Sequence, residues 1–275
     1  MPAYLGASVG VAVHYFTDPA CPISWGTEPT IRRLFVEFGA ELDWRLVMGG
    51  LARDYNGHEK GALVRWVEDA ADIEMPVDPL LWKDGPISST YPACIAVKAA
   101  GEQGVEAAVR YLRVLREGLL CFRRKLDSLE PFVEEARRAR LDVERFRVDA
   151  TSHAMVEAFA ADLELTRQVP PGSPRADRVP FPTLRIADRW FFGRSPYADL
   201  RAAALEAGAA PVQPESISVD AAFERFERLA AKEVEVLCGL LGPLAWAELW
   251  RLATEWVVRP LRVGAGGWLF ERSSS

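Results

Sequence analysis

The chain has 275 residues, of which 49% are hydrophobic and 26% charged, a composition that excludes a disordered, collagen-like or coiled-coil protein. The net charge of −6 gives no basic field for phosphate backbones, so we expect no nucleic-acid partner. The sequence holds no uninterrupted apolar run of the ~18 residues that a membrane span needs, and its first ten residues carry no Lys or Arg. We therefore expect a soluble, cytoplasmic protein without a membrane span or a signal peptide.

The amino-terminal part predicts a strand, a helix and a second strand in that order. Residues 9–16 (VGVAVHYF) form a short apolar run that ends at a Thr-Asp-Pro turn signal, which is typical of a strand. Apolar residues then recur at helical spacing from Ile31 to Phe38, and Gly39 stands where such a helix should end. Residues 41–48 alternate apolar and polar side chains and predict a half-buried strand. A helical crossover between the two strands implies that they run parallel.

The middle of the chain predicts a helical block. Residues 50–90 contain several prolines and predict irregular structure. From Tyr91 to about Gln168 the sequence is Ala-rich, and apolar residues from 105 to 122 form one amphipathic stripe. Further helices are expected at residues 130–138, 143–148 and 152–166, with Asp142 and Ser152 as N-caps.

Strand character returns after a loop rich in Pro, Gly and Ser at residues 169–178. Residues 183–186 and 189–193, separated by an Ala-Asp pair, predict a hairpin. The Ser-Pro pair at 195–196 suits an N-cap followed by the first helical residue, so a helix is expected at residues 197–207.

Residues 211–275 form a separate tail. Helices are expected at residues 221–229, 232–237 and 243–257, before a short apolar segment at 263–270. Helices followed by a Gly-containing ribbon are typical of a winged helix, but seven Lys and Arg against nine Asp and Glu in the tail argue against DNA binding. The last of these helices carries three Trp, and we expect it to form a docking surface or a homodimer interface.

The four cysteines, Cys21, Cys94, Cys121 and Cys238, lie far apart, no Cys-x-x-Cys pair occurs, and the chain has only three His. A disulfide framework or a Cys/His zinc site therefore has little to build on, and we expect free thiols and no metal. Packing is the expected role of the last three cysteines. The alternative for Cys94 is to resolve a mixed disulfide, if the helical block folds over Cys21.

Cys21 stands apart because it lies between the first predicted strand and the first predicted helix. Free N–H groups and the positive end of the helix dipole favour a thiolate there, and such sites lower a cysteine pKa from about 8.5 to about 3.5–7.5. Pro22 suits the first helical turn, and the Ser24 hydroxyl is placed to donate a hydrogen bond to the sulfur. The alternatives are a buried structural thiol at Cys21 and, at Ser24, a residue left by decay of a cysteine. Trp25 either lines the site or packs beneath the helix.

Three further features bear on this site. Pro29 lies inside the predicted helix, where a proline destabilises the helix by about 3 kcal/mol and kinks it, so its presence there suggests a specific role. Phe181-Pro182 opens the third predicted strand, and a cis peptide bond there would turn the backbone toward whatever lies opposite. Glu28 lies two helical turns beyond Cys21, where a solvated carboxylate is expected and a proton relay is the alternative.

These residues together resemble the DsbA-like family of the thioredoxin fold. In that family the active cysteine opens the first helix, a proline kinks it eight residues later, and a cis-proline before the third strand faces the sulfur. Cys21, Pro29 and Pro182 match these positions one by one, and the stretch 15–50 resembles cytoplasmic members of the FrnE and SpxH type. The resemblance covers about residues 9–210 and places no family on the tail.

The resemblance implies an α/β thioredoxin-like fold with an all-helical insertion between the second and third strands and a mainly helical C-terminal extension. It implies that Cys21 is the catalytic nucleophile, assisted by Ser24. The residues expected to contact an extended substrate are Pro22, Trp25, Phe181 and Pro182. The thioredoxin-like domain would comprise residues 1–54 and 175–210, the insertion residues 55–174, and the extension residues 211–275.

The sequence departs from the family at one position, because the usual Cys-x-x-Cys is here Cys21-x-x-Ser24. No intramolecular disulfide can form at this motif, so one-thiol chemistry through a mixed disulfide remains. The expected function is therefore a single-cysteine thiol–disulfide oxidoreductase that acts on a protein or small-molecule thiol or disulfide.

No cofactor is expected to be bound, and glutathione or another small thiol is the expected cosubstrate. Kappa-class glutathione transferases and the related isomerases share this fold and use a serine near this position with bound glutathione, so a relative of these enzymes is one alternative. The other is a non-catalytic adapter that presents a degenerate thioredoxin fold to a partner protein.

Overall fold

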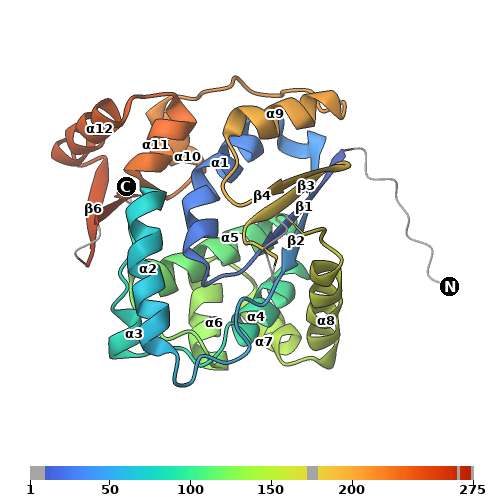
Figure 1. Cartoon of the computed structure of the whole chain (residues 1–275). Helices are drawn as coiled ribbons and strands as arrows, with labels where there is room; N and C mark the ends of the chain where they lie inside the picture. Colours follow the sequence, from blue (N-terminus) through green and yellow to red (C-terminus); the bar gives the residue numbers. More distant parts are fainter. Residues whose placement is uncertain (1–9, 172–178, 265–266, 274–275) are drawn as a thin grey trace.

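The computed structural model describes residues 10–171, 179–264 and 267–273 of the chain (Figure 1). Within these residues the main sheet has four strands in the order β2–β1–β3–β4. Strand β1 is parallel to β2, whereas β3 is antiparallel to both β1 and β4, so the predicted parallel pair and the predicted hairpin are confirmed. The strands are β1 (Val11–Thr17), β2 (Leu42–Met48), β3 (Thr183–Ile186) and β4 (Arg189–Phe192).

Helix α1 (Pro22–Phe38) connects the two parallel strands and continues into the short turn η1 (Gly39–Glu41). Its buried face includes Ile31 and Leu34, and Gly39 ends it with a φ of 53°, a backbone conformation that glycine adopts without a steric penalty. Helix α9 (Tyr197–Glu206) follows the hairpin. Its N-cap is Pro196 rather than the predicted Ser195, because the ψ of 141° at Pro196 keeps that residue outside the helix.

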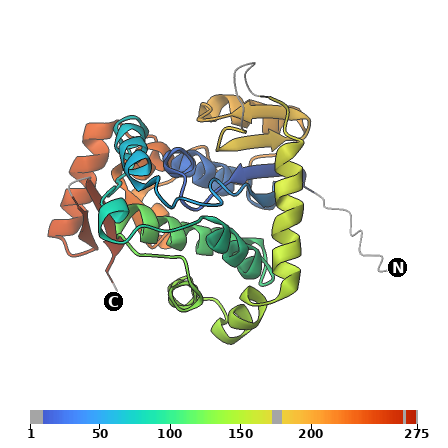
Figure 2. The same ribbon diagram turned by 60° about the horizontal axis from the view of Figure 1, so that its bottom comes forward.

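Helices α4 to α8, between β2 and β3, lie on the opposite side of the sheet from α9 (Figure 1), whereas α2 packs against α1, and the long helix α8 returns the chain to the sheet (Figure 2). Asp142 caps α7 by accepting a hydrogen bond from the Arg145 backbone N–H, as predicted. These elements are α2 (Glu59–Ile73), α3 (Leu81–Asp84), α4 (Tyr91–Gly101), α5 (Val105–Arg116), the π-helical turn η2 (Glu117–Cys121), α6 (Leu129–Arg138), α7 (Val143–Ala150) and α8 (His153–Arg167).

Two predictions for this block are wrong. Residues 50–90 are not irregular throughout, because α2 buries Ala62, Trp66 and Ile73 at helical spacing and the prolines follow it. The stripe from 105 to 122 is not one α-helix, since α5 gives way to a π-helical turn after Arg116. The predicted loop at 169–178 lies mostly outside the described residues.

The chain after α9 forms a unit with its own apolar core and a second sheet in the order β5–β7–β6. The predicted helix 221–229 is too long, because its last residues pair with β7 as a strand, and residues 258–263 form another strand that the sequence did not predict. The elements of this C-terminal unit are α10 (Val219–Arg225), β5 (Arg228–Ala230), α11 (Ala231–Cys238), α12 (Gly242–Thr254), β6 (Val258–Val263) and β7 (Gly267–Arg272).

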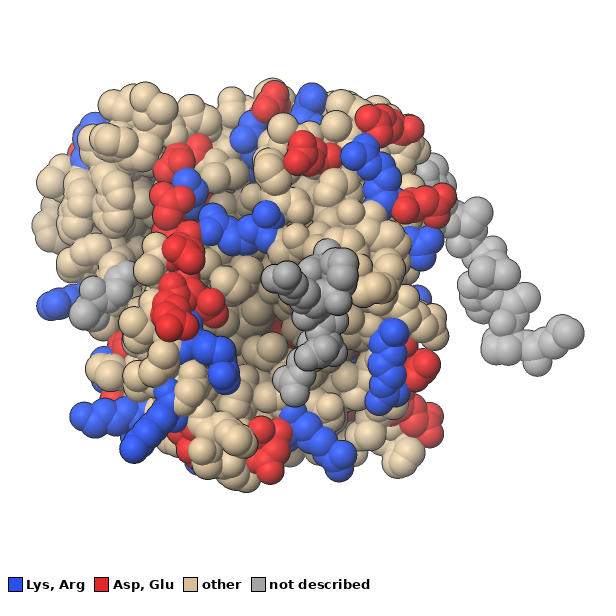
Figure 3. Space-filling model, in the orientation of Figure 1, with Lys and Arg blue, Asp and Glu red and all other residues tan. Residues whose placement is uncertain are grey.

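The outer surface of the C-terminal unit is largely uncharged over α12, as the space-filling view shows at its upper left (Figure 3). Leu244, Trp246 and Trp250 of this helix are exposed, whereas Leu249 and Leu252 are buried in the core. The homodimer expected here stays a prediction. Among the described residues no single helix is long and apolar enough to cross a membrane, and α11 and α12 reach that length and composition only as a pair bent by 112°.

Candidate active site

Cys21 is the N-cap residue of α1, in extended backbone conformation, and Pro22 is the first helical residue. The Cys21 sulfur accepts a hydrogen bond from the Ser24 backbone N–H, with an N–S distance of 3.4 Å. An N–H at this position has no partner within the helix, so the sulfur satisfies a donor that would otherwise be unpaired. The structure therefore confirms the predicted position of Cys21 between the first strand and the first helix.

The backbone before β3 lies directly opposite this sulfur. The Phe181–Pro182 peptide bond is cis, and the Cys21 thiol donates to the Phe181 carbonyl oxygen at 3.6 Å. Gly49, at the end of β2, makes room for the Phe181 ring, because a Cβ on Gly49 would lie 1.9 Å from the ring carbon Cζ. The fold thus brings together two positions separated by 160 residues.

The expected low pKa of Cys21 is wrong. The residue is only 4% exposed, and this burial raises the pKa of the Cys21 thiol above its ordinary value. The Asp18 carboxylate acts in the same direction, whereas the Ser24 side chain, the Ser24 backbone N–H and the Arg116 guanidinium lower the pKa without outweighing burial. The Phe181 carbonyl also favours the protonated thiol, since it accepts the thiol proton.

Ser24 was expected to donate its hydroxyl to the Cys21 sulfur, but the structure shows a different donor. Its backbone N–H is the group that donates to the sulfur, and its fully buried hydroxyl makes no hydrogen bond of ordinary geometry to the described residues. The hydroxyl still lies near enough to the sulfur to oppose the effect of burial on the Cys21 pKa.

Of the residues expected to contact substrate, only Phe181 is partly exposed, and Pro22, Trp25 and Pro182 are buried. The Trp25 indole N–H donates to the Pro76 carbonyl at 3.0 Å, and the Arg113 guanidinium lies 4.3 Å from the centre of its ring. Trp25 therefore packs beneath the helix in this structure, which is the second of its two expected roles, and its contact with substrate stays a prediction.

Asp18 is a component of the site that the sequence did not single out. Its fully buried carboxylate accepts hydrogen bonds from the backbone N–H groups of Ala20 and Leu51 and from the Thr90 hydroxyl, at 2.7–2.8 Å. Burial raises the Asp18 pKa, and these donors oppose the shift. The signal that could have found it is its place in the turn that leads from β1 to Cys21.

All four cysteines are free thiols, and Cys94 contacts Asp18, the same carboxylate that acts on Cys21. Cys94 is fully buried on α4 and its thiol lies 3.4 Å from the Asp18 carboxylate, which together with burial raises the Cys94 pKa well above the ordinary value. Cys121 lies in the π-helical turn, 3.3 Å from the Pro76 carbonyl. Cys238 is half-buried in the C-terminal unit, where burial raises its pKa to about 11.

Glu28 is buried rather than solvated, contrary to the expectation. Its carboxylate pairs with Arg116. Burial opposes ionisation of Glu28, but the guanidinium groups of Arg116 and, secondarily, Arg113 and Arg32 outweigh it and lower the Glu28 pKa. Pro29 follows inside α1, as the sequence predicts. Across the described part of the chain no cluster of His, Cys, Asp or Glu is placed to hold a metal ion.

Comparison with known proteins agrees with this geometry. A family model described as thioredoxin matches residues 14–170, more than half of the chain. The chain belongs to the thioredoxin family. The predicted thioredoxin-like fold, with helices inserted between β2 and β3, is confirmed.

Two relatives of this thioredoxin-family chain carry the name ClpXP adapter protein SpxH. The protein from Halalkalibacterium halodurans is 34% identical over 166 residues, which cover 57% of this chain and 54% of the relative. The protein from Bacillus subtilis is 30% identical over 161 residues, with 57% and 54% coverage. The chain thus matches about half the length of these relatives.

Solved structures show the same fold. The cytosolic disulfide reductase DsbM from Pseudomonas aeruginosa is 20% identical, with a TM-score of 0.56 over 70% of this chain and 96% of DsbM. A structure described as a probable DsbA oxidoreductase from Streptomyces coelicolor is 17% identical, with a TM-score of 0.55 over 76% of this chain and 94% of that one. At these identities the likeness is one of fold.

Proposed function

We propose that this thioredoxin-family protein is a single-cysteine thiol–disulfide oxidoreductase that forms a mixed disulfide at Cys21. The observation that carries the proposal is the position of the Cys21 sulfur, 3.4 Å from the Ser24 N–H at the start of α1 and 3.6 Å from the Phe181 carbonyl. Similarity in fold to a cytosolic disulfide reductase supports the same class of reaction. We also propose a cytoplasmic location, where small thiols are kept reduced.

The reaction consists of two exchanges. The Cys21 thiolate attacks one sulfur of a substrate disulfide, so that a Cys21–substrate S–S bond forms as the substrate S–S bond breaks, and the released thiolate takes up a proton. A small thiol of the glutathione type then attacks the substrate sulfur of the mixed disulfide as a thiolate. Cys21 leaves, regains its proton, and the small thiol ends in a disulfide with the substrate. The released substrate sulfur is reduced, and Cys21 is unchanged.

The proposal assigns the backbone at Phe181 to hold the substrate. Phe181 is partly exposed beside the sulfur, and its carbonyl oxygen accepts the thiol proton in the resting state. An extended substrate that donates an N–H to this oxygen would take the place of the thiol, and Cys21 would lose an interaction that favours its protonated form. Docking and ionisation of Cys21 would then be coupled.

The test uses the purified protein and a disulfide-bonded probe, oxidised glutathione, with intact mass as the readout. The wild type and the matched control Cys94→Ser should each gain the mass of one glutathione, and Cys21→Ser should gain none. Added reduced thiol should remove the adduct. An equal gain in Cys21→Ser, or no gain in the wild type, would overturn the proposal.

A second candidate function is favoured by a specific observation, the similarity to proteins named ClpXP adapter. In this alternative the chain binds a partner protein and Cys21 is a buried structural thiol. Calorimetric titration with purified ClpXP separates the two, because an adapter should bind equally well as wild type and as Cys21→Ser. Complete loss of binding in Cys21→Ser, or no binding by the wild type, would remove the adapter alternative.

A further inference from the structure

Arg116 is the last residue of α5, where the helix passes into the π-helical turn, and it is only 1% exposed. A π-helical turn inserts an extra residue into the helical repeat and is frequent at functional sites. Here the turn begins directly after Arg116, whose buried guanidinium points toward β1 and α1.

The Arg116 guanidinium binds the chain on both sides of Cys21. Its Nη2 donates to the Thr17 hydroxyl at 2.6 Å and to the Tyr15 hydroxyl at 3.2 Å, both on β1. Its Nη1 pairs with the Glu28 carboxylate on α1. Because β1 ends just before Cys21 and α1 begins just after it, one side chain fixes both arms of the turn that carries the sulfur.

The pairing of Arg116 is incomplete. Its Nε–H is buried and has no hydrogen-bond partner among the described residues, so one donor of the guanidinium remains unsatisfied. A buried, unpaired donor costs free energy and asks for an explanation, and a negative charge forming nearby is the simplest one.

The charge of Arg116 acts on the ionisation of the Cys21 thiol. The Arg116 guanidinium lowers the Cys21 pKa against the larger effect of burial, and the pKa of Arg116 itself rises in part through the presence of Cys21. The titratable groups that act on this cluster lie on β1, the turn after it, α1, the segment before α2, α4 and α5: Tyr15, Asp18, Glu28, Arg32, Tyr55, Cys94, Arg113 and Arg116.

We propose that Arg116 is a positioning residue for the reaction at Cys21, which holds the turn between β1 and α1 and supplies the positive charge that stabilises the Cys21 thiolate. The role in the reaction rests on the proposed oxidoreductase function. The effect on ionisation of the thiol does not, and it is measurable without substrate. Glu28 pairs with the same guanidinium, so its carboxylate and the Cys21 thiolate compete for one positive charge, and each of them raises the Arg116 pKa.

The competition distinguishes this role from a purely structural one. Arg116→Gln combined with Glu28→Gln removes both partners of the ion pair and leaves no buried charge unpaired, and it should raise the Cys21 pKa by about one unit, a roughly tenfold loss of thiolate at a fixed pH. Glu28→Gln alone frees the guanidinium and should lower the Cys21 pKa. Arg116→Lys keeps the charge and should retain most of the wild-type value.

The measurement is the pH profile of Cys21 alkylation by iodoacetamide, read by peptide mass spectrometry on folded protein. Arg113→Gln is the matched control, because Arg113 is a buried arginine of the same helix whose carboxylate partners are Glu117 and Glu233, and it should leave the Cys21 profile unchanged. Equal pKa values in the wild type, Glu28→Gln and the double variant would overturn the inference. If the pKa values shift as expected but the wild type forms no glutathione adduct, the proposed function fails and the electrostatic role of Arg116 stands.

Discussion

The surroundings of Cys21 and the C-terminal unit keep their polar groups in different places. Near Cys21, the ionisable side chains of Asp18, Glu28 and Arg116 are buried. In the C-terminal unit the core is apolar, and an arginine such as Arg251 pairs with Glu248 at the surface. Because burying an unpaired charge costs free energy, the difference indicates that buried charges are concentrated around the site and, through Glu233, at the contact between the two regions, whereas the rest of the core of the C-terminal unit is apolar.

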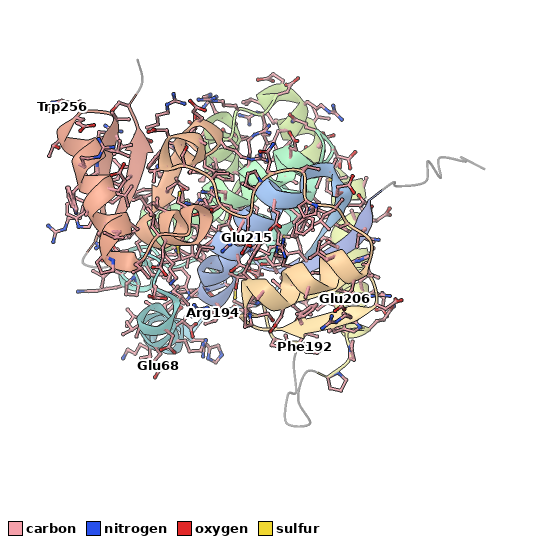
Figure 4. The ribbon with its side chains drawn as sticks, turned by 90° about the horizontal axis from the view of Figure 1, so that it is seen from above. Glu68, Phe192, Arg194, Glu206, Glu215 and Trp256 are labelled. Atoms are coloured by element: carbon pink, nitrogen blue, oxygen red, sulfur yellow. The ribbon has the colours of Figure 1, made fainter. Side chains whose placement is uncertain are left out.

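The contact between the two regions is itself ionic. Glu233 of α11 is fully buried and accepts hydrogen bonds from Arg113 at 2.8 and 3.0 Å, and it pairs with Arg32 of α1 at 2.9 Å. The Glu233 carboxylate also accepts from the Ala230 N–H at the start of its own helix. Seen from above, Trp256 marks the outer end of the C-terminal unit and Phe192 the far side of the main sheet (Figure 4). The charged residues thus join the inner faces of the two regions.

Breaking this ionic contact should have the largest effect on stability. Glu233→Ala leaves the guanidinium groups of Arg113 and Arg32 without their shared carboxylate, and we expect a loss of about 3–5 kcal/mol in the free energy of unfolding. Urea unfolding followed by circular dichroism measures it. Glu235→Ala is the matched control on the same helix, since Glu235 is partly exposed and pairs with Lys232, and it should cost less than about 1 kcal/mol. Similar losses in both variants would show that the contact is not held by these charges.

A change at Gly49 should have the next largest effect and should act on the site itself. The Cβ of Gly49→Ala would overlap the Phe181 ring, and overpacking of this kind costs about 1–3 kcal/mol. The displaced ring should also alter the rate of Cys21 alkylation. Gly61→Ala, in the open part of α2, is the control and should stabilise the protein by about 0.5–1 kcal/mol. An unchanged alkylation rate in Gly49→Ala would show that the position of the Phe181 ring does not affect the reactivity of Cys21.

Acid should weaken the buried ion pairs before it affects the apolar core of the C-terminal unit. The pKa of Glu28 is lowered because nearby arginines outweigh its burial, so its contribution to stability is complete above the ordinary value of about 4.3 and is lost as the pH falls through the folded-state pKa. Burial opposes the ionisation of Glu117, but Arg113 and Arg228 outweigh it and lower the Glu117 pKa, so the contribution of Glu117 to stability is also lost as the pH falls. Urea midpoints measured across this range should decline less steeply for Glu28→Gln than for the wild type, and parallel declines would contradict the assignment.

The smallest effect should come from the outer surface of the C-terminal unit. Trp256 is 84% exposed, so Trp256→Ala should change the free energy of unfolding by no more than about 0.5 kcal/mol. The buried neighbour Leu249 provides the contrast, because Leu249→Ala creates a cavity and should cost about 2–5 kcal/mol. Thermal unfolding of both variants checks the difference. A large loss in Trp256→Ala would mean that this surface contributes to folding.

Local signals in the sequence predicted the elements that local interactions determine. The cap at Cys21, the stop at Gly39 and the hairpin after Thr183 depend on neighbouring residues, and all three are observed. Helix α2 was missed because the prolines that follow it suggested irregular structure for the whole of residues 50–90. Strand β5 was missed because its pairing partner lies in β7, some 40 residues further along the chain.

The ionisation of Cys21 was predicted with the wrong sign for a related reason. The capping position and the helix dipole are local, and both favour the thiolate. The burial of the sulfur and the Phe181 carbonyl that accepts its proton come from segments far away in the sequence, and they favour the thiol. Arg116 was overlooked because nothing in its helical neighbourhood shows that it reaches β1 and α1.

The measurement that tests the central claim most directly is the pH dependence of glutathione adduct formation at Cys21, followed by peptide mass spectrometry after exposure of the folded protein to oxidised glutathione. A reactive thiol with a pKa raised by burial predicts one adduct, confined to Cys21, whose rate of formation rises with pH through a midpoint above about 8.5. Adducts spread over Cys94 or Cys238, or none at Cys21 at any pH at which the protein stays folded, would contradict the account.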